Sequence, residues 1–263
     1  MIFLSKKGQD EYINMFAYGC GQQPVNSDDF EFDSHDQEPI VLRGILNRNI
    51  KRCIKKDRKF YYMDSGYVGN HPGPMNPQGW KLWHRIVSND LQHNEIVTRP
   101  SDRWERLKLK FESRRYGSKI IVAAPDEKPC KFYGVDQQAW IEETVSTIKQ
   151  HTDRPVVVRQ RAASRQHRVF QDPLSQVLRE DCHALVTFNS VAAIESILTG
   201  VPAFVLAPSH AAGPVASRSL SQIETPYWPD LDKLHAWAHH LAYGQFHISE
   251  LKDGLAQQIL IKQ

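Results

Sequence analysis

The chain has 263 residues, of which 41% are hydrophobic and 24% are charged, a balance typical of a folded globular protein. The 33 lysines and arginines exceed the 30 acidic residues by only +3, too little to indicate a nucleic-acid-binding protein by itself. The sequence has no signal peptide and no apolar run of the ~20 residues that a membrane span needs, so it predicts a cytoplasmic protein with no membrane partner. It has no CxxC pair, so no metal centre is expected. Its length predicts one or two domains.

The first half of the chain contains one clear strand–helix–strand pattern. Residues 1–39 are the hardest stretch to interpret, and the acidic, irregular run 28–36 predicts a loop. The apolar run 40–45 ends at a glycine and predicts a buried strand. A helix with one basic face is expected over 47–57, and the aromatic-rich run 59–64 predicts a second strand that ends at Asp64. The elements expected after it are a loop over 69–79, a strand over 81–87 and a helix over 101–117.

The second half of the chain alternates apolar runs with amphipathic segments. The apolar runs predict buried strands over residues 119–125, 155–159, 184–188 and 201–206. The segments between them predict a loop with Asp126, Lys128 and Gly134 after the first strand, and helices over residues 138–150, 173–179 and 190–198. This alternation favours an α/β fold with two Rossmann-like lobes, whose parallel sheets face each other across a cleft. We expect the lobes to comprise residues 1–117 and 118–263.

One strand end in the second half is suited to an anionic ligand. Ligands of open α/β sheets bind outside the carboxyl ends of the strands, and Asn189-Ser190-Val191 lies between such an end and a helix. The hydroxyl of Ser190 and the first helical N–H groups can bind a phosphate, and Glu195 can reach ribose hydroxyls. The alternative is that Ser190 only caps the helix and Glu195 is a surface residue.

The residues that follow carry a resemblance to a known family. The order Ser190, Glu195 and Gly200-Val201-Pro202 resembles a signature of the C-terminal lobe of GT-B glycosyltransferases. The resemblance is greatest to capsule-polysaccharide-type transferases and to related proteins encoded by bacteriophages. The segments that resemble the bacteriophage group lie at residues 62–67, 85–93 and 242–246. The resemblance to GT-B glycosyltransferases implies a nucleotide-diphosphate sugar as co-substrate and no other cofactor. It also implies that residues 118–263 hold the donor and that residues 1–117 face the acceptor.

Two further positions are expected to contact the donor. Capsule transferases often carry His-Pro after the second strand of this lobe, whereas this chain has Arg159-Gln160-Arg161. Arginine forks suit diphosphate oxygens, so Arg159 and Arg161 are predicted donor contacts, with a solvated basic loop as the alternative. His210 lies among small residues after the strand over 201–206, where it can contact the donor or serve only as a structural loop residue.

Sugar transfer to a hydroxyl group needs a base that accepts the proton of the acceptor. Asp64 ends a strand that points to the expected cleft and is the first candidate, with Asp90 and His93 as competing choices. Each of the three could instead cap a turn. The sequence contains no P-loop, GxGxxG or GxSxG motif, which argues against a kinase, a dehydrogenase and a serine hydrolase.

The acceptor is indicated only by charge. Basic residues cluster over 48–59 and 103–115 among aromatic side chains, a combination that can follow a phosphate backbone, although such runs are usually solvated helix faces. With the bacteriophage resemblance, they favour double-stranded DNA with a hydroxymethylated base, which would have to be flipped out in the host cytoplasm. A surface polysaccharide is the alternative acceptor. A non-catalytic nucleotide- or DNA-binding protein of this fold, and a nucleotide-sugar epimerase, are the other functions that stay open.

Overall fold

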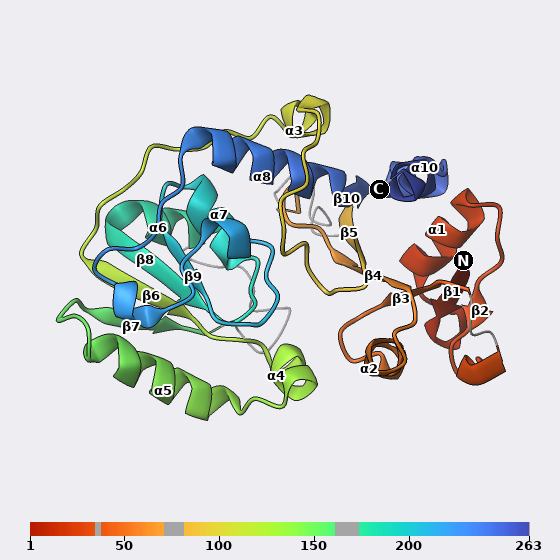
Figure 1. Ribbon diagram of the computed structural model, residues 1–263, viewed down its shortest axis with the longest axis horizontal. Coiled ribbons are helices and arrows are strands. Elements are labelled where there is room, and N and C mark those ends of the chain that lie inside the picture. The colour runs from red at the N-terminus through yellow and green to blue at the C-terminus, as the bar shows by residue number, and fades with distance from the viewer. Residues whose placement is uncertain (35–37, 71–81, 161–173, 263) are drawn as a thin grey trace. The chain divides into compact units, whose positions relative to one another are not determined.

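The computed structural model describes residues 1–34, 38–70, 82–160 and 174–262. They form two compact units, each built on one sheet (Figure 1). Unit 1 comprises Met1–His93 and His239–Gln263, and unit 2 comprises Asn94–Ala238. This division differs from the expected boundary between residues 117 and 118, because residues 94–117 pack within unit 2 and the last 25 residues of the chain return to unit 1.

The sheet of unit 1 is parallel at its centre and antiparallel at one edge. Its strands, in spatial order, are β10 (Gln245–His247), β5 (Trp83–Ser88), β4 (Phe60–Ser65), β3 (Ile40–Arg43), β1 (Ile2–Ser5) and β2 (Val25–Asn26). β1 to β4 run parallel, whereas β5 and β10 pair antiparallel. The expected strand–helix–strand pattern is confirmed by β3, α2 (Arg48–Lys55) and β4, and the side chain of Asn47 caps α2 by accepting the Asn49 N–H at 3.0 Å.

The core of unit 1 joins the two ends of the chain. Its helices are α1 (Glu11–Gly19), α2, α9 (Ile248–Lys252) and α10 (Leu255–Ile261), with 3₁₀ turns η1 (Lys6–Gly8) and η2 (Phe32–Ser34). Phe3 and Phe16 share one buried cluster with Leu251 and Leu260 from the C-terminal helices. A Cβ added at Gly19 would lie 1.9 Å from the Leu251 carbonyl oxygen, so only glycine permits this approach of α1 and α9. Burial of these apolar side chains is the reason that the C-terminus belongs to unit 1.

Unit 2 contains a wholly parallel sheet. Its strands, in spatial order, are β7 (Val156–Arg159), β6 (Lys119–Ala123), β8 (Cys182–Thr187) and β9 (Ala203–Val205). Its helices are α3 (Asp102–Leu107), α4 (Glu127–Tyr133), α5 (Gln137–Lys149), α6 (Leu174–Asp181), α7 (Ala192–Leu198) and the first part of α8 (Leu231–Tyr243), with 3₁₀ turns η5 (Gly213–Val215) and η6 (Leu220–Gln222). Figure 1 shows α5 on one face of the sheet and α6 and α7 on the other. The predicted alternation of strands and helices is confirmed.

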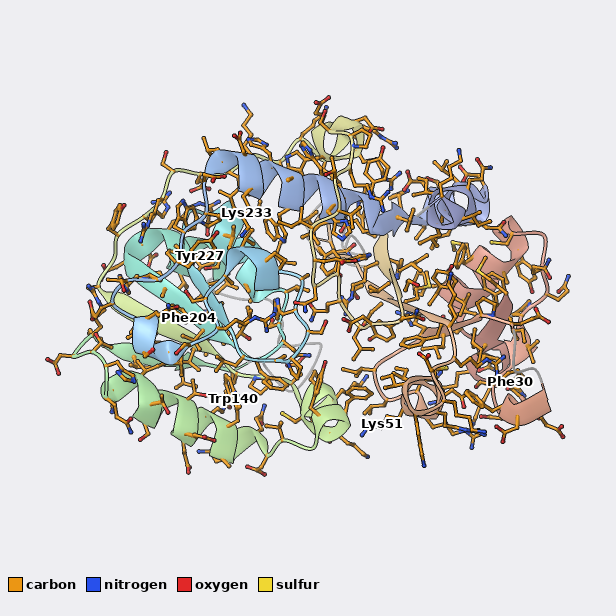
Figure 2. The ribbon with its side chains drawn as sticks, viewed as in Figure 1. Phe30, Lys51, Trp140, Phe204, Tyr227 and Lys233 are labelled. Carbon is orange, nitrogen blue, oxygen red and sulfur yellow. The ribbon has the colours of Figure 1, made fainter. Side chains whose placement is uncertain are left out.

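Alternate residues of these strands fill the two faces of the sheet. Ile120, Val122, Val186 and Phe204 lie in one buried cluster, which Trp140 of α5 covers (Figure 2). Neighbouring positions of β6 and β8 are buried as well, because α6 and α7 cover the opposite face. Strands buried on both faces give the continuous apolar runs that the sequence displays.

Two expectations for unit 2 were wrong. The helix expected over 101–117 ends at Leu107, because Lys108 has a left-handed backbone with φ of 54°. The chain then continues along unit 2, where Glu112 and Arg115 donate backbone hydrogen bonds to the carbonyls of Leu198 and Gly200 at 2.9 and 2.7 Å. The segment after β6 was expected to be a loop but contains α4.

Within the described part of the chain, no helix combines the length and the apolar character needed to cross a bilayer. The same residues contain no group of three or more His, Cys, Asp or Glu side chains placed to hold a metal ion.

Candidate functional site

The carboxyl edge of the unit 2 sheet brings together most of the predicted donor-binding positions. Because β7, β6, β8 and β9 are parallel, their carboxyl ends lie along one edge. Arg159 is the last residue of β7, the segment 189–191 follows β8, and His210 follows β9. Arg161 lies outside the described residues.

The turn after β8 presents two backbone donors. The hydroxyl and carbonyl oxygens of Ser190 accept the N–H groups of Ala192 and Ala193, each at 3.2 Å, just before α7, whose N-cap residue is Val191. These two N–H groups are therefore occupied. The adjacent N–H groups of Ser190 and Val191 have no acceptor among the residues that the structure describes. Two successive backbone donors of this kind can bind an anion.

His210 fixes this turn from behind. Its side chain is fully buried, and its Nδ1 accepts the Ala212 N–H at 2.9 Å. Nδ1 is therefore unprotonated in the neutral ring, and the proton on Nε2 is donated to the Ser190 carbonyl at 3.0 Å. His210 thus holds the Ser190 turn, and its direct contact with a donor stays a prediction.

Glu195 lies one turn into α7 and is partly buried. Its charge acts on Arg179 of α6: the hydrogen bonds that Arg179 donates to Glu112 are the main cause that raises the pKa of Arg179, and the charge of Glu195 adds to it. Arg159 is partly buried at the end of the edge strand β7. Contact of these two side chains with a nucleotide stays a prediction.

Sequence reasoning missed two residues at this edge, Asn94 and Arg218. Ser217 pairs with Phe204 in a single parallel bridge, so Arg218 follows an additional strand-like segment next to β9. Asn94 Oδ1 accepts hydrogen bonds from Arg218 Nη2 at 2.9 Å and from the His210 backbone N–H at 3.2 Å. A one-residue bridge leaves no periodicity, and a lone asparagine has no spacing to a partner, so neither carries a sequence signal.

In unit 1, the first base candidate, Asp64, lies in an ion pair. Its Oδ2 accepts the Tyr62 hydroxyl at 2.6 Å and lies 3.3 Å from Arg85 Nη2, while Oδ1 accepts the Ser65 N–H at 2.8 Å. Burial alone would raise the pKa of the Asp64 carboxyl, but the Arg85 guanidinium and these hydrogen bonds outweigh it and lower this pKa. The carboxylate is therefore a weakened base.

The second candidate, His93, is hydrogen-bonded to Tyr67 twice. The Tyr67 hydroxyl accepts the backbone N–H of His93 at 2.9 Å and lies 2.9 Å from its Nδ1. In either tautomer of the ring, the Tyr67 hydroxyl occupies Nδ1 of His93. Burial raises the pKa of Tyr67 to about 12, so that the phenol keeps its proton.

The third candidate, Asp90, lies near the same tyrosine. Its Oδ1 accepts the Leu91 N–H at 2.6 Å, and the charges of Asp90 and Asp64 both contribute to raising the pKa of Tyr67. Arg85 Nε donates to the Leu91 carbonyl at 3.2 Å, which ties this turn to the Asp64 ion pair. The three candidates therefore belong to one connected cluster.

Three segments that are distant in sequence meet in this cluster. Arg85 joins residues 62–67 to residues 85–93 through Asp64 and the Ser65 carbonyl, which it contacts at 3.3 and 2.7 Å. The segment 242–246 adds Gln245, whose Oε1 accepts the N–H groups of Tyr67 and Val68 at 2.8 and 3.1 Å. A Cβ added at Gly244 would lie 2.3 Å from the His93 ring. The segments singled out by the resemblance thus lie in one hydrogen-bonded cluster of unit 1.

Asp10 and Arg43 extend this cluster, and sequence reasoning missed both. Asp10 follows β1 and caps α1, and its Oδ2 lies 3.4 Å from Arg43 Nη1 at the end of β3. The charge of Arg43 also helps to lower the pKa of Asp64. The strand Ile2–Ser5 that would have pointed to Asp10 is only four residues long, too short to be recognised by periodicity.

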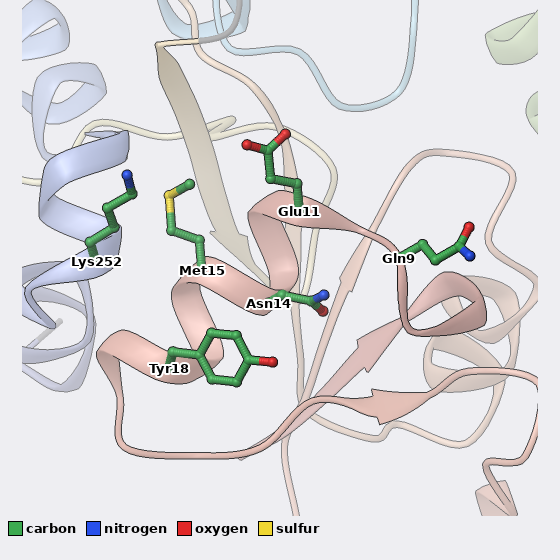
Figure 3. Close-up of a pocket in the computed structure, with 6 residues that line it drawn as sticks. All are labelled: Gln9, Glu11, Asn14, Met15, Tyr18 and Lys252. Atoms are coloured by element: carbon green, nitrogen blue, oxygen red, sulfur yellow. The ribbon is translucent and has the colours of Figure 1, made fainter.

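An open hollow of about 500 Å³ lies elsewhere on unit 1, against the outer side of α1 (Figure 3). The residues that line it are Gln9, Glu11, Asn14, Met15, Tyr18 and Lys252. None of the predicted site residues is among them.

The basic cluster over 48–59 is partly used within unit 1. Arg52 and Lys56 form ion pairs with Asp33 at 3.5 and 2.7 Å. Arg58 is buried and donates to two backbone carbonyl oxygens at 2.7 and 2.9 Å. These three side chains therefore form contacts within unit 1.

The cluster over 103–115 lies in unit 2 and also contains internal contacts. Arg103 is buried, and Arg115 forms an ion pair with Glu112 at 2.6 Å. The prediction that the two clusters share one positive face stays a prediction.

Comparison with known proteins shows similarity in structure only. No family model matches the sequence, and no curated protein sequence matches it. A solved structure described as "Thermosulfurimonas dismutans KpsC, beta Kdo 2,7 transferase" is similar over 100% of both chains, with a TM-score of 0.51 and 12% sequence identity. A beta Kdo 2,4 transferase structure of KpsC from the same organism matches 77% of this chain and 86% of its own, with a TM-score of 0.39 and 10% identity. The first likeness and the two parallel-dominated sheets confirm the predicted α/β, GT-B-like fold class, whereas the cleft between the lobes stays a prediction.

Proposed function

We propose that this protein is a glycosyltransferase that moves a sugar from a nucleotide-activated donor to a hydroxyl group of an acceptor. The observation that carries the proposal is the turn at the carboxyl end of β8, where Ser190 and Val191 offer adjacent backbone donors and buried His210 holds the turn in place. The fold similarity to a beta Kdo 2,7 transferase supports the same class of reaction.

The donor contacts follow from the positions along this edge. The N–H groups of Ser190 and Val191 and the Ser190 hydroxyl bind a phosphate, and Glu195 binds the ribose. Arg159 and Arg161 bind the diphosphate of a nucleotide-diphosphate sugar, which is a co-substrate, and no other cofactor takes part. His210 acts by positioning the turn.

Asp64, Asp90 and His93 remain the candidates for the base, and their contacts support a ranking among them. The ion pair with Arg85 lowers the basicity of Asp64, and the Tyr67 hydroxyl occupies Nδ1 of His93. We therefore assign the proton transfer to Asp90, with the Asp64–Arg85 pair and the Tyr67–His93 pair holding its turn.

Two acceptors are compatible with this reaction. Double-stranded DNA with a hydroxymethylated base requires free cationic side chains, whereas part of the basic cluster over 48–59 is bound to Asp33 and to backbone carbonyls. A saccharide hydroxyl, as in a surface polysaccharide, has no such requirement and is therefore the acceptor that we favour.

The experiment is a transfer assay with radiolabelled sugar nucleotides. The full chain is incubated with each donor and with hydroxymethylated DNA, plain DNA or surface polysaccharide as acceptor. Asp90→Asn should lower the transfer rate by a factor of roughly 10² to 10⁴, the usual contribution of a general base, without weakening nucleotide binding. Asp153→Asn, in an exposed loop of unit 2, is the matched control.

The outcomes separate the alternatives. Label in polysaccharide supports the favoured acceptor, and label in hydroxymethylated DNA alone replaces it with DNA. Nucleotide binding without transfer to any acceptor would contradict the proposal in favour of a non-catalytic binding protein, and interconversion of the donor sugar would favour an epimerase.

A further inference from the structure

Arg218 carries a positive charge that no carboxylate of the described residues balances. The acceptors of its guanidinium are neutral: Nη1 donates to the Ala207 carbonyl and lies 3.5 Å from that of Val205, and Nη2 donates to Asn94 Oδ1 at 2.9 Å. By contrast, Arg154 and Arg179 of the same unit each donate hydrogen bonds from Nε and Nη2 to the carboxylate of a glutamate.

Among the described residues, Arg218 has no oppositely charged partner. Partial burial lowers the pKa of its guanidinium, and no neighbouring charge acts on this pKa. The side chain is nevertheless exposed, so that an anion can approach it from solvent. An anion at this position would restore the favourable interaction that burial removes.

The guanidinium also has hydrogen-bonding capacity to spare. Arginine has five N–H donors, and its Nε–H has no acceptor among the residues described in the structure. The carbonyls of Ala207 and Val205 hold one side of the group, and Asn94 holds Nη2. A planar fork fixed in this way suits the oxygens of a phosphate, because little side-chain freedom is lost on binding.

The position of Arg218 links it to the turn of Ser190. It follows the bridge that extends the parallel sheet beyond β9, so it lies at the carboxyl edge. Asn94 Oδ1 connects it to the backbone of His210, whose ring binds the Ser190 carbonyl. Gly213 leaves space for this arrangement, because an added Cβ would lie 2.3 Å from Arg218 Nη2 and 2.5 Å from Asn94 Oδ1.

We propose that Arg218, held in place by Asn94, is a phosphate-binding residue of the donor site and contacts the phosphate groups of the nucleotide. This inference deepens the proposed function and rests on it for the identity of the ligand. The anion-binding property itself belongs to the side chain and can be measured without any transfer reaction.

The test is calorimetric titration of the full chain with inorganic pyrophosphate. We expect the wild-type protein to bind it and Arg218→Gln to raise the dissociation constant at least about tenfold, the effect expected for one charge-assisted hydrogen bond. Arg218→Lys should fall between them, because lysine keeps the charge but not the fork. Lys149→Gln, which removes an exposed charge from α5 of the same unit, should bind as the wild type does.

A second variant tests the site without removing the arginine. Gly213→Ala places a methyl group against Arg218 and Asn94, and it should weaken pyrophosphate binding while the melting temperature shows that the protein is folded. Absence of pyrophosphate binding to the wild type, or equal binding by the wild type, Arg218→Gln and Gly213→Ala, would overturn the proposal.

The source of the phosphate is tested by competition. A nucleoside diphosphate that displaces pyrophosphate and loses affinity in Arg218→Gln supports the donor assignment. Displacement by duplex DNA but by no nucleotide would overturn it. If pyrophosphate and nucleotide binding depend on Arg218 while the wild type transfers no sugar, the site stands and the proposed function fails. If the wild type transfers sugar and Arg218→Gln transfers it equally well, the proposed function stands and the role of Arg218 in the donor site fails.

Discussion

The imidazole of His210 donates a hydrogen bond to the carbonyl of Ser190 across 3.0 Å, and this contact joins the loop after β9 to the turn after β8. Both ring nitrogens are bound to backbone atoms, and the ring is fully buried. A side chain placed in this way determines the geometry of its neighbour, here the turn to which we assign the donor phosphate.

The first prediction concerns this contact. His210→Ala should lower the free energy of unfolding by about 1–3 kcal/mol, because the buried partners of the ring lose their hydrogen bonds. It should also weaken nucleotide binding, since the turn is no longer held. Chemical denaturation and nucleotide titration measure the two effects. His210→Gln, which keeps one donor, should recover part of both, and a variant that binds nucleotide like the wild type would contradict the positioning role.

The second prediction concerns Glu195. If its carboxylate binds the ribose, Glu195→Ala should weaken nucleotide binding by roughly tenfold or more, since a charge-assisted hydrogen bond contributes about 1.5–3 kcal/mol. Glu143→Ala, which removes an exposed glutamate from α5, is the control and should bind nucleotide normally. Unchanged affinity of Glu195→Ala for every nucleotide tested would remove Glu195 from the site.

The third prediction concerns the pH dependence of stability. The Arg85 guanidinium and the Tyr62 hydroxyl hold the pKa of Asp64 below its ordinary value although burial raises it. The ionised carboxylate therefore stabilises the folded state above the unfolded-state pKa of about 3.9, and this stability is lost as pH falls through the lower pKa of the folded state.

Asp64→Asn should remove this part of the acid sensitivity. At neutral pH we expect a loss of about 1–3 kcal/mol, reduced from the value for a fully buried pair because the Asp64 side chain is 34% exposed. Urea unfolding of the wild type and the variant between neutral and acidic pH measures both quantities. Parallel stability curves for the two proteins below about pH 4 would refute the assigned pKa direction.

The fourth prediction distinguishes the acceptors by salt. If duplex DNA binds through five or six phosphates, its affinity should fall by roughly three orders of magnitude between about 50 and 200 mM salt, because each neutralised phosphate contributes a slope of about −0.9. A saccharide acceptor is held by hydrogen bonds and stacking, so its binding should change little. We expect the affinity for the acceptor to depend only weakly on salt concentration. Tight binding of duplex DNA with a steep salt dependence would instead indicate that DNA is the acceptor.

The sequence predicted the sheet of unit 2 better than that of unit 1. β6 and β8 are buried on both faces and give continuous apolar runs, which Pro125 ends after β6 and Asn189 ends after β8. In unit 1, β1 has four residues and β10 has three, and their burial depends on partners far away in the chain. Such short segments have no periodicity of their own, so the pairing of β10 with β5 could not be predicted.

The sequence could place the candidate site where it depends on strand ends. Ser190 and His210 were proposed because they follow apolar runs, and the position after a strand defines the binding edge of a parallel sheet. Arg218 and Asn94 can be identified as candidate site residues only from tertiary contacts. Arg218 is a candidate because no carboxylate of the described residues contacts it, and the sequence does not show this. The sequence left the role of His210 open between ligand contact and structure, and its burial, which favours the structural role, cannot be read from the sequence.

The central claim is that the carboxyl edge of unit 2 binds the nucleotide of a sugar donor, and thermal unfolding with a panel of nucleoside diphosphates tests it most directly. At a concentration about 100 times its dissociation constant, a ligand adds about 2.7 kcal/mol of stability, which raises the melting temperature of a chain of this size by roughly 5–10 °C. We predict such a rise in the melting temperature for the nucleoside diphosphate of one nucleobase, and a smaller rise in the Glu195→Ala and Arg218→Gln variants. No rise with any nucleotide, or a rise that both variants retain in full, would contradict the claim.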